Sequence, residues 1–203
     1  TAILVPKYSM SLGAELTAYT GLVTLVQLSA STIGDQNSVS YDIGISVIRN
    51  VLAATKKLRE NPQDEDARVI LYGASISTSG RLGLGKEENY AYDIYEVMSV
   101  PEDLYSASYR KSLTAMFPPF LKAMAKYHEA DIRRYFKDAF GYEGSIEESA
   151  LKMTKLFEEL GANMYFDGEI SVEETKTVNM STMFSVEEVT ECRFTIHVLQ
   201  LNN

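Results

Sequence analysis

Apolar residues recur every three to four positions over most of the chain, which predicts a fold built from helices. The clearest pattern covers residues 40–59, where apolar positions share one face and basic residues gather at the C-terminal end. Its predicted apolar face consists of Ile43, Val47, Val51 and Ala54. Other helices are predicted over residues 15–31, 90–98, 106–127 and 131–140. The pattern as a whole predicts an all-α domain of eight or nine helices.

A stretch of small and apolar residues from Asn61 to Gly85 is predicted to contain the central helix of the fold. The Asn61-Pro62 pair suits a turn, and Asp64 and Asp66 suit the positive end of the helix that follows. The residues at helical spacing are Ala67, Ile70, Leu71, Ala74, Ser75 and Thr78. Because small side chains let neighbouring backbones approach closely, we expect other helices to surround this one.

The ends of the helices are marked by prolines and by capping boxes. Pro101 is expected to end the 90–98 helix, and Pro118-Pro119 is expected to bend the 106–127 helix. In the last third of the chain, a serine precedes a glutamate by three positions at three places, which is the pattern of a capping box. These helix starts are predicted at Ser145, Ser171 and Ser185.

The two ends of the chain are less helical in pattern. Residues 1–8 are expected to form an extended lead-in to a single helical domain covering residues 1–203. Within that lead-in, residues 1–5 suit a short strand without a partner, which hints at pairing with another chain along an exposed edge. Residues 194–201 are apolar and β-branched enough for a strand, although their position in the chain favours a helix.

Composition limits the classes of binding partner and the cellular locations that fit this chain. The chain has 203 residues and a net charge of −9, and this charge argues against nucleic acid and against an anionic membrane surface. No apolar run is long enough to span a bilayer. Cys192 is the single cysteine, so no internal disulfide can form and we expect a reducing, cytoplasmic location.

Four segments carry motifs that occur together in one enzyme family. Residues 1–25 run from a strand through a turn into a helix with a Thr-Gly pair, and residues 61–85 carry Asn-Pro-x-Asp-x-x-Ala-Arg. Residues 116–122 are an apolar segment with two prolines, and residues 157–161 end in Leu-Gly. In this order and spacing the segments resemble the iron-containing alcohol dehydrogenases of the dehydroquinate synthase-like superfamily. The resemblance implies the helical C-terminal half of that family, without its N-terminal nucleotide-binding domain.

The resemblance also places the metal ligands of the family on this chain, where other residues stand. In the family, an aspartate and a histidine four residues apart and two later histidines bind a divalent metal. By the resemblance, these ligands fall on Val23, Gln27, Tyr95 and Tyr109. Because iron and zinc sites use imidazole and carboxylate ligands, the resemblance implies that the metal site is lost. We therefore expect no bound metal and no catalytic residue in this chain.

Two interpretations of the former metal site remain open. If the fold is kept, Val23, Gln27, Tyr95 and Tyr109 converge on one cavity. In the first interpretation the cavity is a repacked core, filled by tyrosines that hydrogen-bond through their hydroxyls. In the second it is a small-molecule pocket lined by Gln27, Tyr95, Tyr109 and Arg110, in which Arg110 could bind a carboxylate or a phosphate.

Other candidate residues are weaker. Glu96, Glu102 and Asp103 form an acidic patch that suits a solvated loop, or a general base if one of them is buried. His128 suits the negative end of a helix. Cys192 lies near glutamates in sequence, which raise the pKa of a thiol and argue against a nucleophile.

Three functions fit these observations. The first is a non-catalytic helical domain of dehydrogenase ancestry with a structural, binding or regulatory role. The second is one half of a split or processed alcohol dehydrogenase, which requires a nucleotide-binding partner chain with NAD(P) and a divalent iron or zinc ion. The third is a metal-independent protein with a small-molecule pocket. A homo-oligomer is compatible with each of them.

Overall fold

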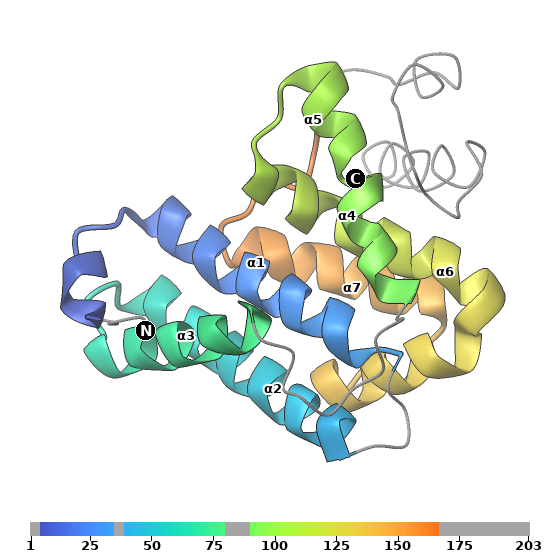
Figure 1. Cartoon of the computed structure of the whole chain (residues 1–203), viewed down its shortest axis with the longest axis horizontal. Coiled ribbons are helices and arrows are strands. Elements are labelled where there is room, and N and C mark those ends of the chain that lie inside the picture. Colours follow the sequence, from blue (N-terminus) through green and yellow to red (C-terminus); the bar gives the residue numbers. More distant parts are fainter. Residues whose placement is uncertain (1–4, 35–38, 80–89, 167–203) are drawn as a thin grey trace.

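The computed structural model describes residues 5–34, 39–79 and 90–166, and every regular element in these ranges is a helix (Figure 1). The expected all-α class is therefore confirmed for the described part of the chain. The elements are η1 (Pro6–Ser9), α1 (Ala14–Thr32), α2 (Val39–Glu60), α3 (Glu65–Ser79), η2 (Tyr90–Asp93), α4 (Ile94–Val97), α5 (Ser99–Tyr105), α6 (Tyr109–Phe140) and α7 (Ile146–Glu159). The 3₁₀ helix η1 takes up residues 6–8 of the expected extended lead-in.

The expected number of eight or nine helices is not reproduced. In the described ranges the α-helices are α1 to α7. The predicted helices 106–127 and 131–140 lie in α6, which is interrupted between them by non-helical torsion angles at His128, so the predicted division is found within one long element. The predicted helix starts at Ser171 and Ser185 and the segment 194–201 lie outside the described residues.

Two of the proline predictions were wrong in position. Pro101 lies in the first turn of α5, where its missing N–H would have had no partner in any case, so it belongs to the start of a helix. Pro118 and Pro119 lie buried inside α6, and the residue with non-helical torsion angles is His128, with φ −133° and ψ 38°. The break in α6 therefore lies at His128, C-terminal to the prolines that were expected to cause it.

The central helix is α1, not α3 as the sequence suggested. Helices α2, α3 and α6 all pack on α1, and its side chains are buried on several sides, as in Leu22, Leu25 and Leu28 (Figure 1). Helix α3 exposes Val69 and Ile76, so only one of its faces is covered. A helix that is apolar all round is central, whereas small residues mark only a close-packed face.

The buried face of α2 agrees in part with the predicted one. Val51 and Ala54 are buried as predicted, whereas Val47 is half-buried and Ile43 is exposed. The buried arc is wider than the predicted stripe and also contains Ile45, Ile48 and Leu52.

Helices α1 and α2 approach each other closely at two glycines. A Cβ added to Gly21 would overlap Oγ1 of Thr55 and lie 2.8 Å from its Cγ2. Further along the pair, a Cβ on Gly44 would overlap Oγ1 of Thr32 and lie 2.8 Å from its Cγ2. Each glycine thus receives a threonine from the opposite helix, and the order of the contacts makes the two helices antiparallel.

The capping box at Ser145 is confirmed. Ser145 Oγ accepts a hydrogen bond from the Glu148 N–H at 3.1 Å, and the Ser145 N–H donates to Glu148 Oε2 at 2.9 Å. Both bonds satisfy donors that the first turn of α7 would leave unpaired. Helix α7 then lies against α6.

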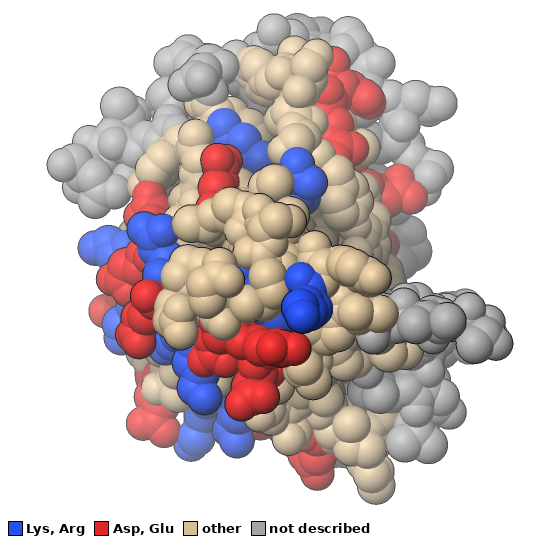
Figure 2. All heavy atoms as spheres, turned by 90° about the vertical axis from the view of Figure 1, so that its left-hand side faces the viewer, with Lys and Arg blue, Asp and Glu red and all other residues tan. Residues whose placement is uncertain are grey.

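Among residues 5–34, 39–79 and 90–166, no helix is both long and apolar enough to cross a membrane. The end of the molecule at the left of Figure 1, where η1 and α3 lie, is seen face-on in Figure 2. On that face acidic and basic side chains are mixed, with uncharged surface between them. This mixture does not form the continuous basic area that phosphate backbones require.

Candidate functional site

Helix α1 presents Val23 and Gln27 on one face, because residues four apart in a helix lie one turn above the other. Both side chains are half-buried. The first turn of α6 lies opposite, and Gln27 Nε2 donates a hydrogen bond to the Tyr109 hydroxyl oxygen at 3.1 Å. Two of the four positions assigned to metal ligands are therefore in direct contact, although they are 82 residues apart in sequence.

Tyr95 reaches the same region from α4. Burial raises the pKa of the Tyr95 hydroxyl, and the nearby Tyr109 and Tyr92 hydroxyls raise this pKa further. The rings of Tyr92 and Tyr95 stack with centroids 6.1 Å apart and planes at 23°. The Tyr95 phenol is therefore neutral at physiological pH, and it adds no charge to the Gln27–Tyr109 pair.

Arg110 is exposed and lies toward a different residue of α1. Burial raises the pKa of Tyr19, while a hydrogen bond from Asn163 and the positive charge of Arg110 act in the opposite direction. The Tyr19 hydroxyl accepts that hydrogen bond from the Asn163 N–H at 3.0 Å. Arg110 thus lies within electrostatic reach of Tyr19. Among the described residues the Gln27 side chain bonds to Tyr109 and not to Arg110.

The other candidate residues from the sequence, one histidine and three acidic residues, differ in burial and in the elements that carry them. His128 lies at the break inside α6, where the first helical part of that element ends as predicted, and it stacks on Tyr90 with ring centroids 3.7 Å apart. Glu96 and Glu102 are half-buried, and Asp103 is exposed. Burial raises the pKa of Glu102, and the charge of Asp103 raises it further. Cys192 lies outside the described residues.

A search of the described residues for three or more neighbouring His, Cys, Asp or Glu side chains that could hold a metal ion finds none. The side chains at the positions to which the resemblance assigns metal ligands are poor ligands. Valine has no donor atom, an amide is a weak ligand, and a phenol must lose its proton before it binds a metal strongly.

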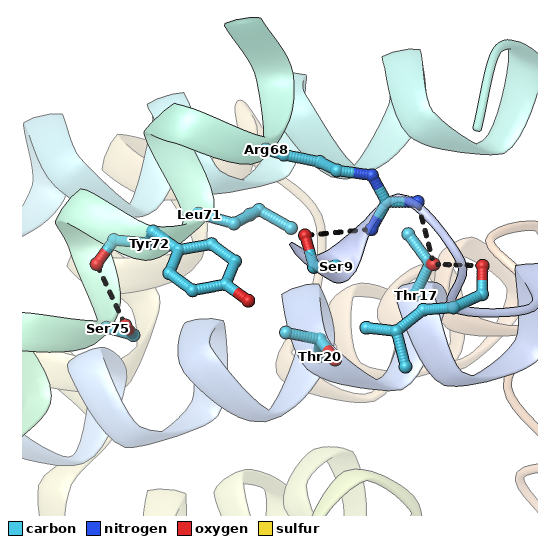
Figure 3. Close-up of a pocket in the computed structure, with 8 residues that line it drawn as sticks. Ser9, Thr17, Thr20, Arg68, Leu71, Tyr72 and Ser75 are labelled. Carbon is cyan, nitrogen blue, oxygen red and sulfur yellow. Dashed lines mark hydrogen bonds between the residues drawn. The ribbon is translucent and has the colours of Figure 1, made fainter. Parts of the chain in front are cut away.

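A second site was missed by the sequence analysis. A cavity of about 260 Å³ lies between η1, α1 and α3 (Figure 3). Its wall contains one permanent charge, the guanidinium of Arg68, which is only 3% exposed. The lining residues are Ser9, Leu12, Thr17, Thr20, Arg68, Leu71, Tyr72 and Ser75. The signal in the sequence was an arginine on the same stripe of α3 as Ala67 and Leu71, which are both buried.

The arrangement of helices is that of the helical part of the iron-containing alcohol dehydrogenases. Among solved structures, NADH-dependent butanol dehydrogenase A from Thermotoga maritima is 19% identical, with a TM-score of 0.80 over 94% of this chain and 54% of that chain. Aldehyde reductase YqhD from E. coli is 14% identical, with a TM-score of 0.73 over 98% of this chain and 56% of that chain. The iron-containing alcohol dehydrogenase from Thermotoga maritima is 16% identical, with a TM-score of 0.63 over 95% and 52%.

No family model and no curated protein sequence matches the chain. At identities of 14–19% the structural likeness establishes the fold alone. The chain spans about half the length of the enzymes that it resembles, between 52% and 56% of each. The resemblance stated from sequence motifs is thus confirmed at the level of the fold.

Proposed function

We propose that this chain is a non-catalytic domain that keeps the helical scaffold of the iron-containing alcohol dehydrogenases and uses it for binding. The observation that carries the proposal is the hydrogen bond between Gln27 and Tyr109, 3.1 Å long, at two positions where the family resemblance places metal ligands. This bond pairs the amide with the phenol, so neither side chain needs a metal ion to satisfy it.

The raised pKa of Tyr95 supports the same proposal. Tyrosine binds iron or zinc as the phenolate, and burial of Tyr95 disfavours the charged form. Val23 contributes no donor atom, so the four positions together offer one amide and two phenols. This set does not fit a divalent iron or zinc ion, whose usual ligands are imidazole, carboxylate or thiolate.

Metal analysis of the purified chain tests the proposal. The chain is loaded with Fe²⁺ or Zn²⁺ under reducing conditions, desalted and analysed by mass spectrometry of the elements, and we expect far less than one metal ion per chain. A variant that combines Val23→Asp, Gln27→His, Tyr95→His and Tyr109→His serves as the matched comparison. We expect this variant to retain zinc and to melt at a higher temperature with zinc than without it.

One result overturns the proposal: stoichiometric iron or zinc in the unmodified chain, lost when Tyr109 is replaced by phenylalanine. That substitution removes the hydroxyl and keeps the ring, so a lost metal would identify the phenol as a ligand. If neither the quadruple variant nor the unmodified chain retains metal, these four positions are not the family's ligand positions.

A second proposal rests on the half-length match to the solved enzymes, 54% of butanol dehydrogenase A in one case. In this proposal the chain works with a separate nucleotide-binding chain as one half of a dehydrogenase. Affinity purification of the tagged chain from its native cells tests it, because the partner must co-purify and the complex must bind NAD(P). A complex that binds no NAD(P) contradicts this alternative and leaves the first proposal standing.

A further inference from the structure

Arg68 is a buried cation without an acidic partner in the described part of the chain. Its guanidinium is 3% exposed, and no salt bridge found among the described residues includes it. Two of its N–H groups, on Nε and Nη2, donate to the Pro62 carbonyl oxygen at 3.2 and 2.8 Å. A buried charge of this kind is costly unless an opposite charge or a full set of hydrogen bonds offsets it.

The other hydrogen bonds of Arg68 are long. Nη1 lies 3.5 Å from Ser9 Oγ, and Nη2 lies 3.4 Å from Thr17 Oγ1. Distances of 2.7–3.2 Å are usual for strong bonds between such groups. The side of the guanidinium that faces Ser9 and Thr17 is therefore only weakly satisfied, and Figure 3 shows that this side points toward the cavity.

Tyr72 provides the second donor to the cavity. Residues 68, 71, 72 and 75 lie on one stripe of α3, because they are spaced by three or four positions. Figure 3 shows the Tyr72 ring lying between α3 and α1, with its hydroxyl directed into the space near Ser9 and Thr20. Within the described residues this hydroxyl makes no hydrogen bond.

The remaining hydroxyls of the cavity donate to backbone carbonyls, with the longest of these bonds, 3.4 Å, running from Thr17 Oγ1 to the Leu12 carbonyl. Ser9 Oγ donates to the Pro6 carbonyl at 2.6 Å, Thr20 Oγ1 donates to the Leu16 carbonyl at 2.8 Å, and Ser75 Oγ donates to the Tyr72 carbonyl at 2.8 Å. The cavity thus offers two donors to a ligand, the Arg68 guanidinium and the Tyr72 hydroxyl. A ligand with an anionic acceptor group complements them.

The walls and the size restrict the rest of the ligand. Leu12 and Leu71 supply apolar surface, and the cavity volume of about 260 Å³ is small. Ligand pockets for drug-sized molecules measure roughly 300–1,000 Å³. One guanidinium neutralises a single negative charge, and a guanidinium binds a carboxylate in a two-pronged geometry.

We propose that the cavity between η1, α1 and α3 binds a small monocarboxylate with a short aliphatic chain. The carboxylate pairs with Arg68 and accepts a hydrogen bond from Tyr72, and the aliphatic chain lies against Leu12 and Leu71. This site shares no residue with the Gln27–Tyr109 pair. Its test therefore succeeds or fails independently of the metal analysis.

The experiment measures binding of acetate, propionate, butyrate and valerate to the full chain by calorimetry and by melting temperature, at constant ionic strength. Butyramide, which is neutral and close to butyrate in shape, and inorganic phosphate are the comparison ligands. We expect saturable binding of the carboxylates that strengthens with chain length until the cavity is full, and no binding of butyramide. Binding of phosphate as tight as that of butyrate would overturn the assignment to carboxylates.

Two variants locate the site without removing Arg68. Tyr72→Phe deletes only the hydroxyl, and we expect it to weaken butyrate binding about tenfold, the effect of one hydrogen bond to a charged group. Thr20→Leu fills the cavity from α1, and we expect it to abolish binding. The matched control is Tyr8→Phe, since Tyr8 is 83% exposed and does not line the cavity.

The proposal is overturned if no carboxylate binds in the millimolar range, or if binding persists unchanged in both Tyr72→Phe and Thr20→Leu. Arg68→Lys keeps the charge and loses the planar fork, so we expect weaker binding than in the unmodified chain. If Arg68→Lys fails to fold, the two other variants still decide the question, because neither changes the hydrogen bonds of Arg68 to Pro62.

Discussion

Replacement of Gly21 by alanine tests the close contact between α1 and α2. The added Cβ would overlap Oγ1 of Thr55, a side chain that is 2% exposed. Thr55 Oγ1 also donates to the Val51 carbonyl at 2.8 Å, so this threonine cannot rotate away without losing a hydrogen bond. Either the two helices move apart or Thr55 leaves its present conformation.

The magnitude follows from three opposing effects. Alanine favours a helix over glycine by about 1 kcal/mol. Overpacking a tight contact costs about 1–3 kcal/mol, and losing the Thr55 hydrogen bond costs about 1 kcal/mol. The net loss of unfolding free energy is therefore about 1–3 kcal/mol, which lowers the melting temperature by roughly 2–12 °C for a domain of this size.

Gly73 provides the matched control, because it lies in the interior of α3 and a Cβ there would meet nothing within 4 Å. Gly73→Ala gains the helix preference without a clash, so we expect a stabilisation of about 0.5–1 kcal/mol. Urea unfolding followed by circular dichroism measures both variants. A double variant of Gly21→Ala with Thr55→Ala should recover part of the loss, because the overlapping atoms are gone.

The reasoning is refuted if Gly21→Ala is as stable as Gly73→Ala. It is refuted equally if the Gly21→Ala and Thr55→Ala effects simply add, since independent sites are additive and contacting sites are not.

Four further predictions concern other parts of the fold. Tyr135→Phe removes a fully buried hydroxyl that is hydrogen-bonded to Ser29 Oγ, so we expect a loss of about 1 kcal/mol in urea unfolding, and no loss would contradict that bond. Ser145→Ala removes the cap of α7 and should cost about 1 kcal/mol in the same assay, whereas Ser145→Thr, which keeps the hydroxyl, should cost less. Hydrogen bonds from the backbone and side chain of Ser145 lower the pKa of Glu148 below 4.5, so its stabilising effect is complete above pH 4.5 and is lost as the pH falls through the folded-state pKa. The urea midpoint of Glu148→Gln should therefore fall less on acidification than that of the unmodified chain, and equal slopes would contradict the capping role. Burial raises the pKa of Asp93 above 3.8, which destabilises its charged form at neutral pH, so Asp93→Asn should raise stability at pH 7 and lose this advantage below pH 3.8.

Local signals in the sequence were sufficient for several elements. The helices over residues 15–31 and 40–59 were predicted to within one residue at each end of α1 and α2, because long runs of regular apolar spacing identify a helix without tertiary information. The Ser145 capping box was predicted for the same reason, since both of its hydrogen bonds lie within four residues of sequence. In each case the deciding interactions are close in the chain.

Features that depend on packing could not be predicted in this way. Small residues drew attention to α3, but the close contacts between α1 and α2 involve Gly21 and Gly44, which stand singly among larger residues. A glycine alone does not reveal that a threonine faces it from another helix. The predicted buried face of α2 was wrong at Ile43 for a related reason, because Ile43 and Ile45 are equally apolar and only the neighbouring helices decide which is covered.

The cavity at Arg68 shows the same limit more clearly. Its walls come from η1, α1 and α3. Ser9 and Arg68 are 59 positions apart in the sequence, and no local sequence pattern indicates that they lie together. The sequence motif that ends in Arg68 indicated a family resemblance, but it did not indicate a functional role for the arginine side chain. A buried arginine becomes a candidate site only when the structure shows which of its N–H groups are poorly satisfied.

Under the proposed function, polar side chains at the positions where the family resemblance places metal ligands connect the elements that a metal ion would join. Gln27 of α1 bonds to Tyr109 of α6, and Tyr95 of α4 lies close enough to Tyr109 for the Tyr109 hydroxyl to raise the pKa of Tyr95. A metal site that loses one ligand leaves the others buried and unpaired, which costs about 1–3 kcal/mol for each group. Under the proposed function, exchanging these side chains together reduces that cost, because Gln27 and Tyr109 are hydrogen-bonded to each other. Replacing Gln27 alone with histidine should then be worse for stability than replacing the full set, a non-additive result that urea unfolding of the single and quadruple variants would reveal.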